Sequence, residues 1–336
     1  MLRGFEGEAR ASDVLEVLRP LGVRAVYLKP FAKDRSKLGG ALPAVVTEAT
    51  PAAGETLAES LVVREVDWKL EVRLYDGLST GVFLDQRENR AFVREWCAAR
   101  GAGVSVLNTF AYTCAFSVAA ARGGAATTSV DVSGRYLDWG KRNLALNGAA
   151  VENRDGGGAT PQEKGSPPAS QSLGTLPLGA GGTKAPSSAP PKAAGHLLPP
   201  SREKGAELSA TSEQHRFARM GTFEFFAYAR RKGLSYDMVI LDPPSFGAAS
   251  KKDGVKAWSS VDGYAGLVAE AAELARPGGL VLASTNTGEL CRGGGVGLEK
   301  QIVKGLGRSP SWVKLPAAPV DFAGERDRFA ARAFVV

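Results

Sequence analysis

A carboxylate at the abrupt end of a short apolar run is the feature of this sequence best suited to chemistry. In the segment YDMVILDPPSFG, at residues 236–247, the apolar residues 238–241 are followed at once by Asp242, Pro243 and Pro244. An uninterrupted apolar run of this length is typical of a strand buried on both faces of a parallel sheet. Proline cannot continue the hydrogen-bonded ladder, so we expect the strand to end at Asp242.

The loop after that strand is expected to be stiff, because two prolines fix two φ angles. It lies at the carboxyl edge of the sheet, where open α/β folds bind ligands. A carboxylate and carbonyl groups beside an aromatic plane suit a flat heterocycle, which they hold by its edge and its face. The candidate catalytic residues are therefore Asp242, Pro243, Pro244, Ser245 and Phe246. A rigid turn without chemistry is the alternative interpretation.

A second turn between a strand and a helix lies upstream. Residues 106–113, VLNTFAYT, read as a strand that runs into a helix, and Asp131 ends the next strand. This order is typical of a site that holds a ribose hydroxyl pair, with an acidic residue about 20 positions after the turn. The turn lacks the G-x-G-x-x-G pattern that a dinucleotide pyrophosphate requires. A nucleoside without phosphate needs no such glycines, and S-adenosylmethionine is one. An ordinary αβ unit with a surface aspartate is the alternative.

The elements around these two turns alternate between strand and helix. The pattern predicts strands at residues 104–107, 128–130, 216–218, 238–241 and 280–283, and helices at 88–100, 115–121, 133–146, 222–231 and 264–274. Repeated βα units with short connections predict an α/β, Rossmann-like fold with a doubly wound, mostly parallel sheet.

The remaining segments suggest how the chain is divided. Residues 1–75 predict a small α+β N-terminal subdomain, with a helix at 11–21 and a hairpin at 61–73, and residues 76–336 predict the main domain. The segment 151–214 is rich in Gly, Pro, Ser and Ala and has no aromatic residue. It cannot bury enough apolar surface to offset chain entropy, so we expect a disordered insert.

Composition excludes several classes of protein. No stretch approaches the roughly 18 apolar residues of a membrane span, and the N-terminus lacks a secretory pattern. Three widely separated cysteines indicate a reducing compartment without disulfides or a zinc cluster, so we expect a cytoplasmic location, with an organelle left open. The net charge of +7 and the pI near 9.3 favour a polyanionic partner.

Several motifs occur in an order that resembles one known family. VLNTFAYTCAFSVAAARGGA, SVDVS, LDPPSFG and RPGGLVLASTN resemble the class I S-adenosylmethionine-dependent methyltransferases of 23S ribosomal RNA, a group with cytosine-5 and guanine-N7 branches. STGVFLDQRENR, at residues 79–90, is similar to the segment that those enzymes place beside the cofactor. The resemblance covers roughly residues 60–150 and 214–336. It implies S-adenosylmethionine as the cofactor, large-subunit ribosomal RNA as the partner and no metal; a homodimer is left open.

The resemblance also implies roles for individual residues. The residues implied at the cofactor are Asp85, Gln86, Arg87, Asn108, Phe110, Tyr112, Thr113, Asp131 and Ser133, and those implied at the substrate are Lys251, Lys252 and Asn286. Among them, Asp131 would hold the ribose and Arg87 would pair with the methionine carboxylate.

Three departures from the family pattern accompany these motifs. Cys114 and Ala115 stand where the family has Gly-Gly or Gly-Ala, so a Cβ atom there either crowds the cofactor or narrows the turn. Gly221 stands where the family supplies an aspartate near the adenine amine. The PUA-type RNA-binding domain common in the cytosine-5 branch has no counterpart among residues 1–75.

The acceptor atom follows from the nucleophiles available. Methylation at carbon 5 of cytosine requires a covalent thiolate adduct, but Ser284 to Thr287 occupy the place where the cytosine-5 branch has its cysteine. We expect Cys114 and Cys291 to be buried and structural. Nitrogen is therefore favoured as the acceptor. The alternatives are a decayed methyltransferase that only binds RNA, and a methyltransferase for DNA or a protein amide.

Overall fold

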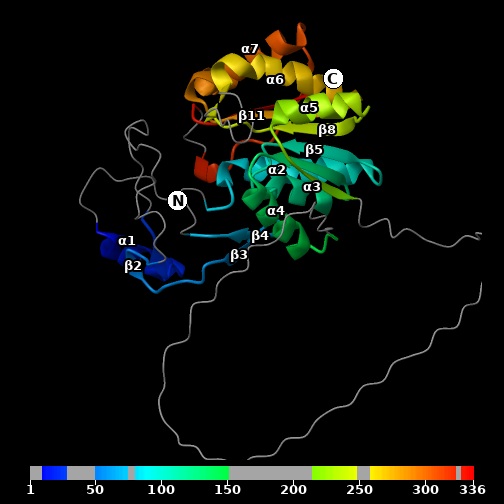
Figure 1. The fold of residues 1–336 in the computed structure, drawn as a ribbon. Helices are drawn as coiled ribbons and strands as arrows, with labels where there is room; N and C mark the ends of the chain where they lie inside the picture. The colour runs from blue at the N-terminus through cyan, green and yellow to red at the C-terminus, as the bar shows by residue number, and fades with distance from the viewer. Residues whose placement is uncertain (1–9, 29–49, 75–79, 151–213, 248–257, 323–326) are drawn as a thin grey trace, which may run out of the picture. The chain divides into compact units, whose positions relative to one another are not determined.

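The computed structural model of the chain describes residues 10–28, 50–74, 80–150, 214–247, 258–322 and 327–336 (Figure 1). The predicted insert at 151–214, apart from Gln214, lies outside the described residues, as do Lys251 and Lys252.

A seven-stranded sheet, in the order β12-β13-β11-β8-β5-β6-β7, organises the part of the chain that the structure describes. Its strands are β5 (Ser105–Thr109), β6 (Ala126–Asp131), β7 (His215–Arg219), β8 (Tyr236–Leu241), β11 (Ala275–Thr285), β12 (Ser311–Val313) and β13 (Ala330–Val335). Strand β13 is antiparallel to both of its neighbours, and the other pairings are parallel. The strand order reverses between β5 and β8. The predicted Rossmann-like, doubly wound, mostly parallel sheet is thus confirmed.

Helices cover both faces of this sheet. They are α2 (Arg87–Arg100), α3 (Ala115–Arg122), α4 (Gly134–Leu146), α5 (Thr222–Arg231), α6 (Ser260–Leu274) and α7 (Gly288–Leu306). In Figure 1, α5, α6 and α7 lie on one face, while α2 and α3 lie on the other. The bounds of α5 are those predicted, and the strands are longer than predicted by one to several residues at their ends.

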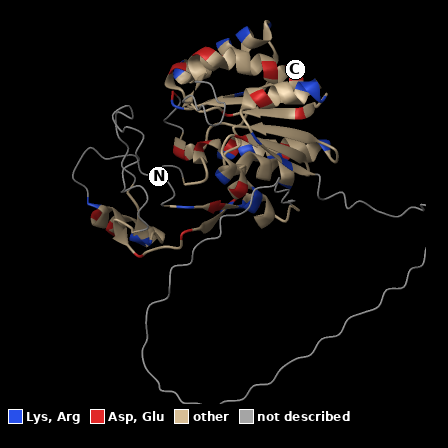
Figure 2. Ribbon diagram, viewed as in Figure 1, with Lys and Arg blue, Asp and Glu red and all other residues tan. Residues whose placement is uncertain are grey.

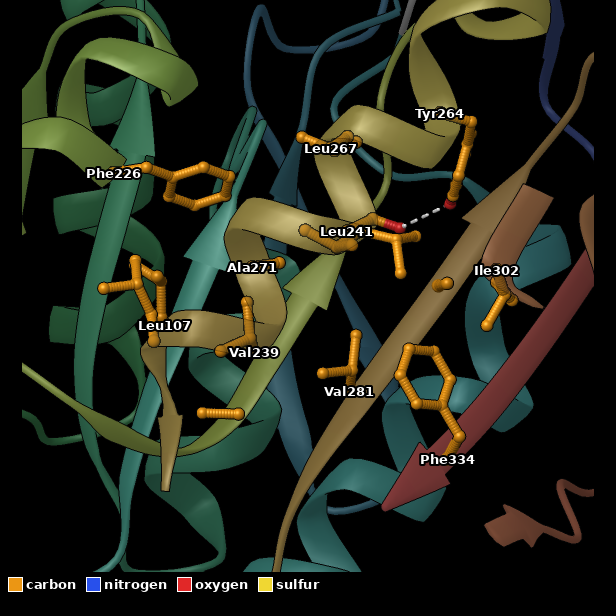
Figure 3. Close-up of a cluster of buried hydrophobic side chains, with 14 of the residues drawn as sticks. Leu107, Phe226, Val239, Leu241, Tyr264, Leu267, Ala271, Val281, Ile302 and Phe334 are labelled. Carbon is orange, nitrogen blue, oxygen red and sulfur yellow. Dashed lines mark hydrogen bonds between the residues drawn. The ribbon is translucent and has the colours of Figure 1, made fainter. Parts of the chain in front are cut away.

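The alternation of side chains explains why the central strands read as unbroken apolar runs. On β8, Val239 and Leu241 join the cluster under α5, α6 and α7, while Met238 and Ile240 join the cluster under α2 and α3. All four are fully buried. Figure 3 shows the first cluster, in which the Tyr264 hydroxyl donates to the Leu241 carbonyl at 3.4 Å. Strands covered on both faces have no polar side to alternate with.

The N-terminal elements include a hairpin that belongs to the same core. Here lie α1 (Ala11–Leu18), the 3-10 turn η1 (Arg19–Leu21), β1 (Ala25–Val26), β2 (Ala53–Gly54), β3 (Leu61–Glu65) and β4 (Trp68–Val72). On β4, Trp68 and Leu70 are buried with Val118, Ala119 and Leu144 of α3 and α4. The separate subdomain at residues 1–75 stays a prediction, and β4 shares its packing with the main domain.

No helix within the described ranges is both long and apolar enough to span a bilayer. The cysteines Cys97, Cys114 and Cys291 are free and buried.

Candidate active site

Two loops leave neighbouring strands at one edge of the sheet. Thr109 on β5 and Leu241 on β8 are register partners, and the Thr109 hydroxyl donates to the Ile240 carbonyl at 2.7 Å. Phe110 and Asp242 therefore begin their loops side by side, at the point where the strand order reverses. This is the edge where an open α/β sheet binds its ligand. The structure brings together the two stretches that the sequence singled out.

The loop after β5 has an unusual backbone. Phe110, Tyr112 and Cys114 have φ angles of 53°, 49° and 60°, in the left-handed region that non-glycine residues rarely adopt. Each such residue costs on the order of 1–3 kcal/mol, and strain of this kind clusters at functional sites. Hydrogen bonds hold the turn, from the Ala111 N–H to the Val130 carbonyl at 2.9 Å and from the Cys114 N–H to the Ala111 carbonyl at 2.7 Å.

Asp131 closes this turn from the end of β6. Its two carboxylate oxygens accept from the backbone N–H groups of Tyr112, at 2.9 Å, and Ser133, at 2.8 Å. Burial raises the pKa of Asp131, and these two hydrogen bonds oppose the shift. A carboxylate oxygen accepts more than one hydrogen bond, so each still has capacity for a hydroxyl group. Two acceptor oxygens held in this way are compatible with a ribose diol, and the contact of Asp131 with a ribose stays a prediction.

The side chains of Asn108 and Thr113 face inwards. The Asn108 amide is 2% exposed and donates to the Ser117 hydroxyl at 2.9 Å. The Thr113 hydroxyl donates to the Gly81 carbonyl at 2.5 Å, and Thr113 is fully buried. These two predicted cofactor residues therefore fix the shape of the turn through their side chains and leave backbone groups to line it.

Asp242, at the end of β8, sits in a chain of hydrogen bonds. The Ser284 hydroxyl donates to the Asp242 carboxylate at 2.7 Å, and the Gln86 amide donates to the Ser284 hydroxyl at 2.9 Å. The Asn89 amide in turn donates to the Gln86 carbonyl at 2.8 Å. These contacts fix the direction in which the carboxylate points.

Burial raises the pKa of Asp242 to about 6, and the nearby carboxylate of Asp85 adds to the increase. The Ser284 hydrogen bond works in the opposite direction. A carboxyl group with a pKa near neutrality is suited to accept a proton or to bind the N–H of a base, and such groups are frequent at functional sites.

The segment before α2 reaches this edge through Gln86, and its contact with the cofactor stays a prediction. Asp85 and Gln86 lie in the 3-10 turn η4 (Leu84–Gln86) and act on Asp242 as described above. The Arg87 guanidinium donates to Asp321 at 2.7 Å and lies 3.5 Å from Glu88. Arg87 is therefore engaged by acidic side chains here, and its contact with a methionine carboxylate stays a prediction.

The proline loop carries an exposed aromatic ring. The Ser245 hydroxyl donates to the Asn286 side-chain oxygen at 2.7 Å, and the Trp258 indole donates to the Pro244 carbonyl at 2.9 Å. Strand β9 (Phe246–Gly247) pairs antiparallel with β10 (Trp258–Ser259). This pairing fixes the backbone of Phe246, while its side chain is 73% exposed. An exposed aromatic ring of this kind is suited to stacking on a base, and that role of Phe246 stays a prediction.

The buried thiols are unsuited to nucleophilic attack. Burial raises the pKa of Cys114 and Cys97 to about 12 and that of Cys291 to about 11. The Cys291 thiol donates to the Thr285 carbonyl at 3.4 Å. Since the thiolate is the reactive form, these cysteines match the structural role expected from the sequence.

Sequence reasoning missed the residues that hold the site from behind. The Asn143 amide donates to the Thr113 carbonyl at 2.9 Å, and its oxygen accepts from the Glu71 N–H at 2.8 Å. The buried Arg90 donates to Glu65 at 2.6 Å and to the Phe83 carbonyl at 2.9 Å. Both sets of contacts tie the β3–β4 hairpin to the candidate site. A pair separated by 72 positions leaves no local sequence signal.

Comparisons with known proteins agree with this geometry. Residues 48–155 match the family model described as S-adenosylmethionine-dependent methyltransferase. A protein of Bacillus subtilis described as putative ribosomal RNA large subunit methyltransferase YwbD is 30% identical over 228 residues, which are 68% of this chain and 40% of that protein. Ribosomal RNA large subunit methyltransferase K/L of Psychrobacter is 54% identical over 91 residues, 27% of this chain and 11% of that protein.

A solved structure also resembles this chain. The structure described as SMU.776, a putative methyltransferase complexed with SAH, matches with a TM-score of 0.60 and 29% identity, over 84% of this chain and 58% of that one. A putative S-adenosylmethionine-dependent methyltransferase of Streptococcus mutans matches with a TM-score of 0.59 and 28% identity, over 85% and 58%. The chain thus spans about two fifths of the length of the first relative and less than two thirds of these structures.

Proposed function

The chain belongs to the S-adenosylmethionine-dependent methyltransferases, and on this premise we propose that it methylates a base of large-subunit ribosomal RNA. A ring or exocyclic nitrogen is the favoured acceptor. The observation that carries the proposal is the placement of the strained turn at 110–114 and the Asp242 loop on adjacent strands of one sheet edge. A methyl donor and an acceptor base held there would be neighbours, and such positioning supplies much of the rate of a transfer reaction.

The residues of the first loop fit the cofactor. When bound, S-adenosylmethionine supplies a methyl group on a positively charged sulfur. Asp131 has two oriented oxygens that accept hydrogen bonds from the ribose hydroxyls. The left-handed backbone at Phe110 and Tyr112 lines the methionine end of the cofactor. Arg87 reaches the methionine carboxylate once it exchanges Asp321 for that partner.

The residues of the second loop fit a base. Phe246 offers its exposed ring for stacking, and Asp242, oriented by Ser284, accepts a hydrogen bond from a base N–H group. Asn286, which is exposed and bonded to Ser245, lies at the same loop. Methylation at a nitrogen needs this geometry and no covalent adduct, and the raised thiol pKa values described above favour that route.

Ribosomal RNA as the substrate rests on the relatives and on charge. Both curated relatives carry ribosomal RNA large subunit methyltransferase in their names. The net charge of +7 suits a polyanionic partner. A cytoplasmic location follows from the same assignment as a proposal, and a homodimer remains open.

Substitution of Asp242 tests the proposal. Asp242→Ala is expected to lower methyl transfer to ribosomal RNA by about 100-fold or more, because it removes the oriented acceptor for the base. Asp262→Ala, an exposed carboxylate in the first turn of α6, is the matched control. Calorimetry with S-adenosylhomocysteine and thermal unfolding check that the variant binds cofactor and folds. Unchanged turnover in Asp242→Ala would refute the assignment.

The acceptor atom has its own test. Nucleoside mass spectrometry of ribosomal RNA, from cells with and without the protein, identifies the methylated base and position. Cys291→Ala should leave turnover within about twofold of wild type if no thiolate adduct forms. Formation of 5-methylcytidine, lost in this variant, would overturn the nitrogen assignment.

A further inference from the structure

A basic hollow lies on the outer side of helix α4, beside the candidate ribose site. Its volume is about 750 Å³. It is lined by residues just after β4, from the β6–α4 connection and α4 itself, and at the end of β7: Arg73, Val132, Ser133, Gly134, Arg135, Asp138, Arg142 and Arg219. Figure 2 shows the positions of the charged residues on the ribbon. Four arginines from three elements converge on one concave surface.

A buried carboxylate lies beneath two of the arginines of the hollow. Glu71, which is 5% exposed, binds Arg73 at 2.8 Å and Arg142 at 2.9 Å from below. Burial opposes ionisation of Glu71, but the two guanidinium groups outweigh it and hold the pKa of Glu71 below its usual value. One buried carboxylate is thus shared by two of the arginines that line the hollow.

The outer rim carries further positive charge. The acidic lining residue, Asp138, is paired with Lys141 at 3.0 Å. Arg219 forms no ion pair with another residue that the structure describes, and its side chain lies against Gly134. The Cβ atom that residue 134 lacks would approach the Cδ atom of Arg219 to 3.2 Å, which is a tight contact, so the glycine leaves room for the arginine.

A surface arginine elsewhere shows the contrast. Arg230 on α5 is held between Glu270, at 3.0 Å, and Glu273, at 3.1 Å, and its charge is matched on the surface. The hollow instead gathers four guanidinium groups on one concave surface. Arrays of this type bind phosphate groups, because the guanidinium fork donates two parallel hydrogen bonds to phosphate oxygens.

The hollow adjoins the candidate active site through Ser133. This residue lines the hollow and also donates its N–H group to Asp131 at 2.8 Å. Arg219 ends β7, so it lies at the carboxyl edge of the same sheet. The cofactor carries no phosphate, and its carboxylate is assigned above to Arg87, so the arginines of the hollow have no anionic partner left on it.

We infer that this hollow binds a backbone phosphate of the RNA substrate, on the far side of Asp131 from the proline loop. The inference rests on the proposed function and extends it by naming where the strand is held. Phosphate contacts of this kind position a nucleic acid without reading its sequence. The hollow therefore sets the affinity for RNA and the register of the strand, while the Asp242 loop selects the base.

The test is the salt dependence of RNA binding, measured by fluorescence anisotropy with a fragment of large-subunit ribosomal RNA. Arg135→Gln combined with Arg219→Gln removes two exposed guanidinium groups. We expect this variant to bind RNA several-fold more weakly at about 0.1 M salt, with the slope of log K against log salt reduced by about 1 to 2. Its affinity for S-adenosylhomocysteine should stay within about twofold of wild type.

Two control variants sharpen the result. Arg135→Lys with Arg219→Lys keeps the charge and should retain most of the salt slope. Arg230→Gln with Arg231→Gln removes the same charge from α5 and should change RNA binding little. Thermal unfolding confirms that each variant is folded.

The outcomes separate the two proposals. If the wild-type chain binds RNA and the Arg135→Gln, Arg219→Gln variant binds it with the same affinity and slope, this inference alone is refuted. If the α5 variant causes the larger loss, the RNA track lies on α5 and the inference is again refuted. If the wild-type chain binds S-adenosylhomocysteine but no RNA, the proposed function fails as well. Binding of inorganic phosphate in the millimolar range, measured by calorimetry, with no binding of RNA would mark the hollow as a site for a small anion and overturn the RNA assignment.

Discussion

The Sγ atom of Cys114 occupies the space that a Cβ atom at Gly140 would fill. Cys114 is the N-cap residue of α3, with a φ angle of 60°, and Gly140 lies in the middle of α4. The cysteine side chain thus packs against Gly140 of α4 and is fully buried. Of the two effects that the sequence allowed for Cys114, crowding of the cofactor is not supported by this packing.

We predict that the two positions are coupled in stability. Gly140→Ala should destabilise the protein by about 1–3 kcal/mol, because the new methyl group overlaps the cysteine sulfur. Cys114→Gly should be nearly neutral, since relief of the left-handed strain offsets the lost packing. The double variant should be at least as stable as wild type, because alanine is the better helix residue. Urea denaturation in a double-mutant cycle measures the coupling. If the changes in unfolding free energy of the two single variants simply add up in the double variant, Cys114 and Gly140 are not in contact.

The fold was accessible from the sequence because its signals are local. The apolar run at 238–241, ended by two prolines, predicts a buried strand and its stopping point without reference to any other residue. The same is true of the turn at 106–113 and of Asp131. Helix α7 and the pairing of β13 escaped prediction, since three consecutive glycines, Gly293 to Gly295, interrupt the helical pattern.

The supports of the site were not accessible, because they join distant positions. Asn143, Glu71 and Thr113 read as an ordinary helix surface, a hairpin residue and a turn residue. The pairing of Arg87 with Asp321 spans 234 positions. Such contacts arise only once the sheet has brought the segments together, so no spacing rule reports them.

The raised pKa of Asp242 predicts that ionisation of this carboxyl group lowers the stability of the folded protein. A carboxyl group whose pKa rises from 3.8 to about 6 on folding makes the folded state less stable wherever it is ionised. Below about pH 3.8 the group is protonated in both states and the penalty vanishes; it grows through pH 6 and is constant above. Asp242→Asn should therefore raise the melting temperature at pH 8 and leave it nearly unchanged at pH 3.5. An equal change in melting temperature at pH 8 and at pH 3.5 would show that the pKa of Asp242 is not raised in the folded protein.

The pH dependence of methyl transfer should report the same group. If ionised Asp242 binds the base, kcat/KM falls as the pH drops through about 6. Ser284→Ala removes the hydrogen bond that lowers the pKa of Asp242, so the acidic limb should move to higher pH. An unmoved limb in Ser284→Ala would mean that another group controls the profile.

Gly221 offers a gain-of-affinity experiment. It caps α5 with φ −64° and ψ 145°, without a side-chain hydrogen bond, and a Cβ atom there would meet nothing within 4 Å. Gly221→Asp should therefore be tolerated and should add a cap of a few tenths of a kcal/mol. It should also tighten binding of S-adenosylhomocysteine, by supplying the carboxylate that the resembled family places near the adenine amine. Gly221→Ser, which caps α5 with a shorter side chain, is the control.

Calorimetry separates the two effects at this position. Tighter cofactor binding in Gly221→Asp but not in Gly221→Ser would locate the adenine beside α5. Equal binding in both variants, with only the stability raised, would place the adenine elsewhere.

The ion pair of Arg87 and Asp321 predicts a competition for the guanidinium group. The two side chains are 2.7 Å apart and partly exposed, so breaking the pair should change the free energy of unfolding little. Asp321→Asn should release Arg87 and tighten S-adenosylhomocysteine, if Arg87 pairs with the carboxylate of the methionine moiety. Arg87→Gln should weaken binding by about tenfold, the effect of losing one charge-assisted pair. Combining the two substitutions provides the control: without the guanidinium, Asp321→Asn should have no further effect. If Asp321→Asn leaves the affinity for S-adenosylhomocysteine unchanged while Arg87 is present, this arginine does not reach the cofactor.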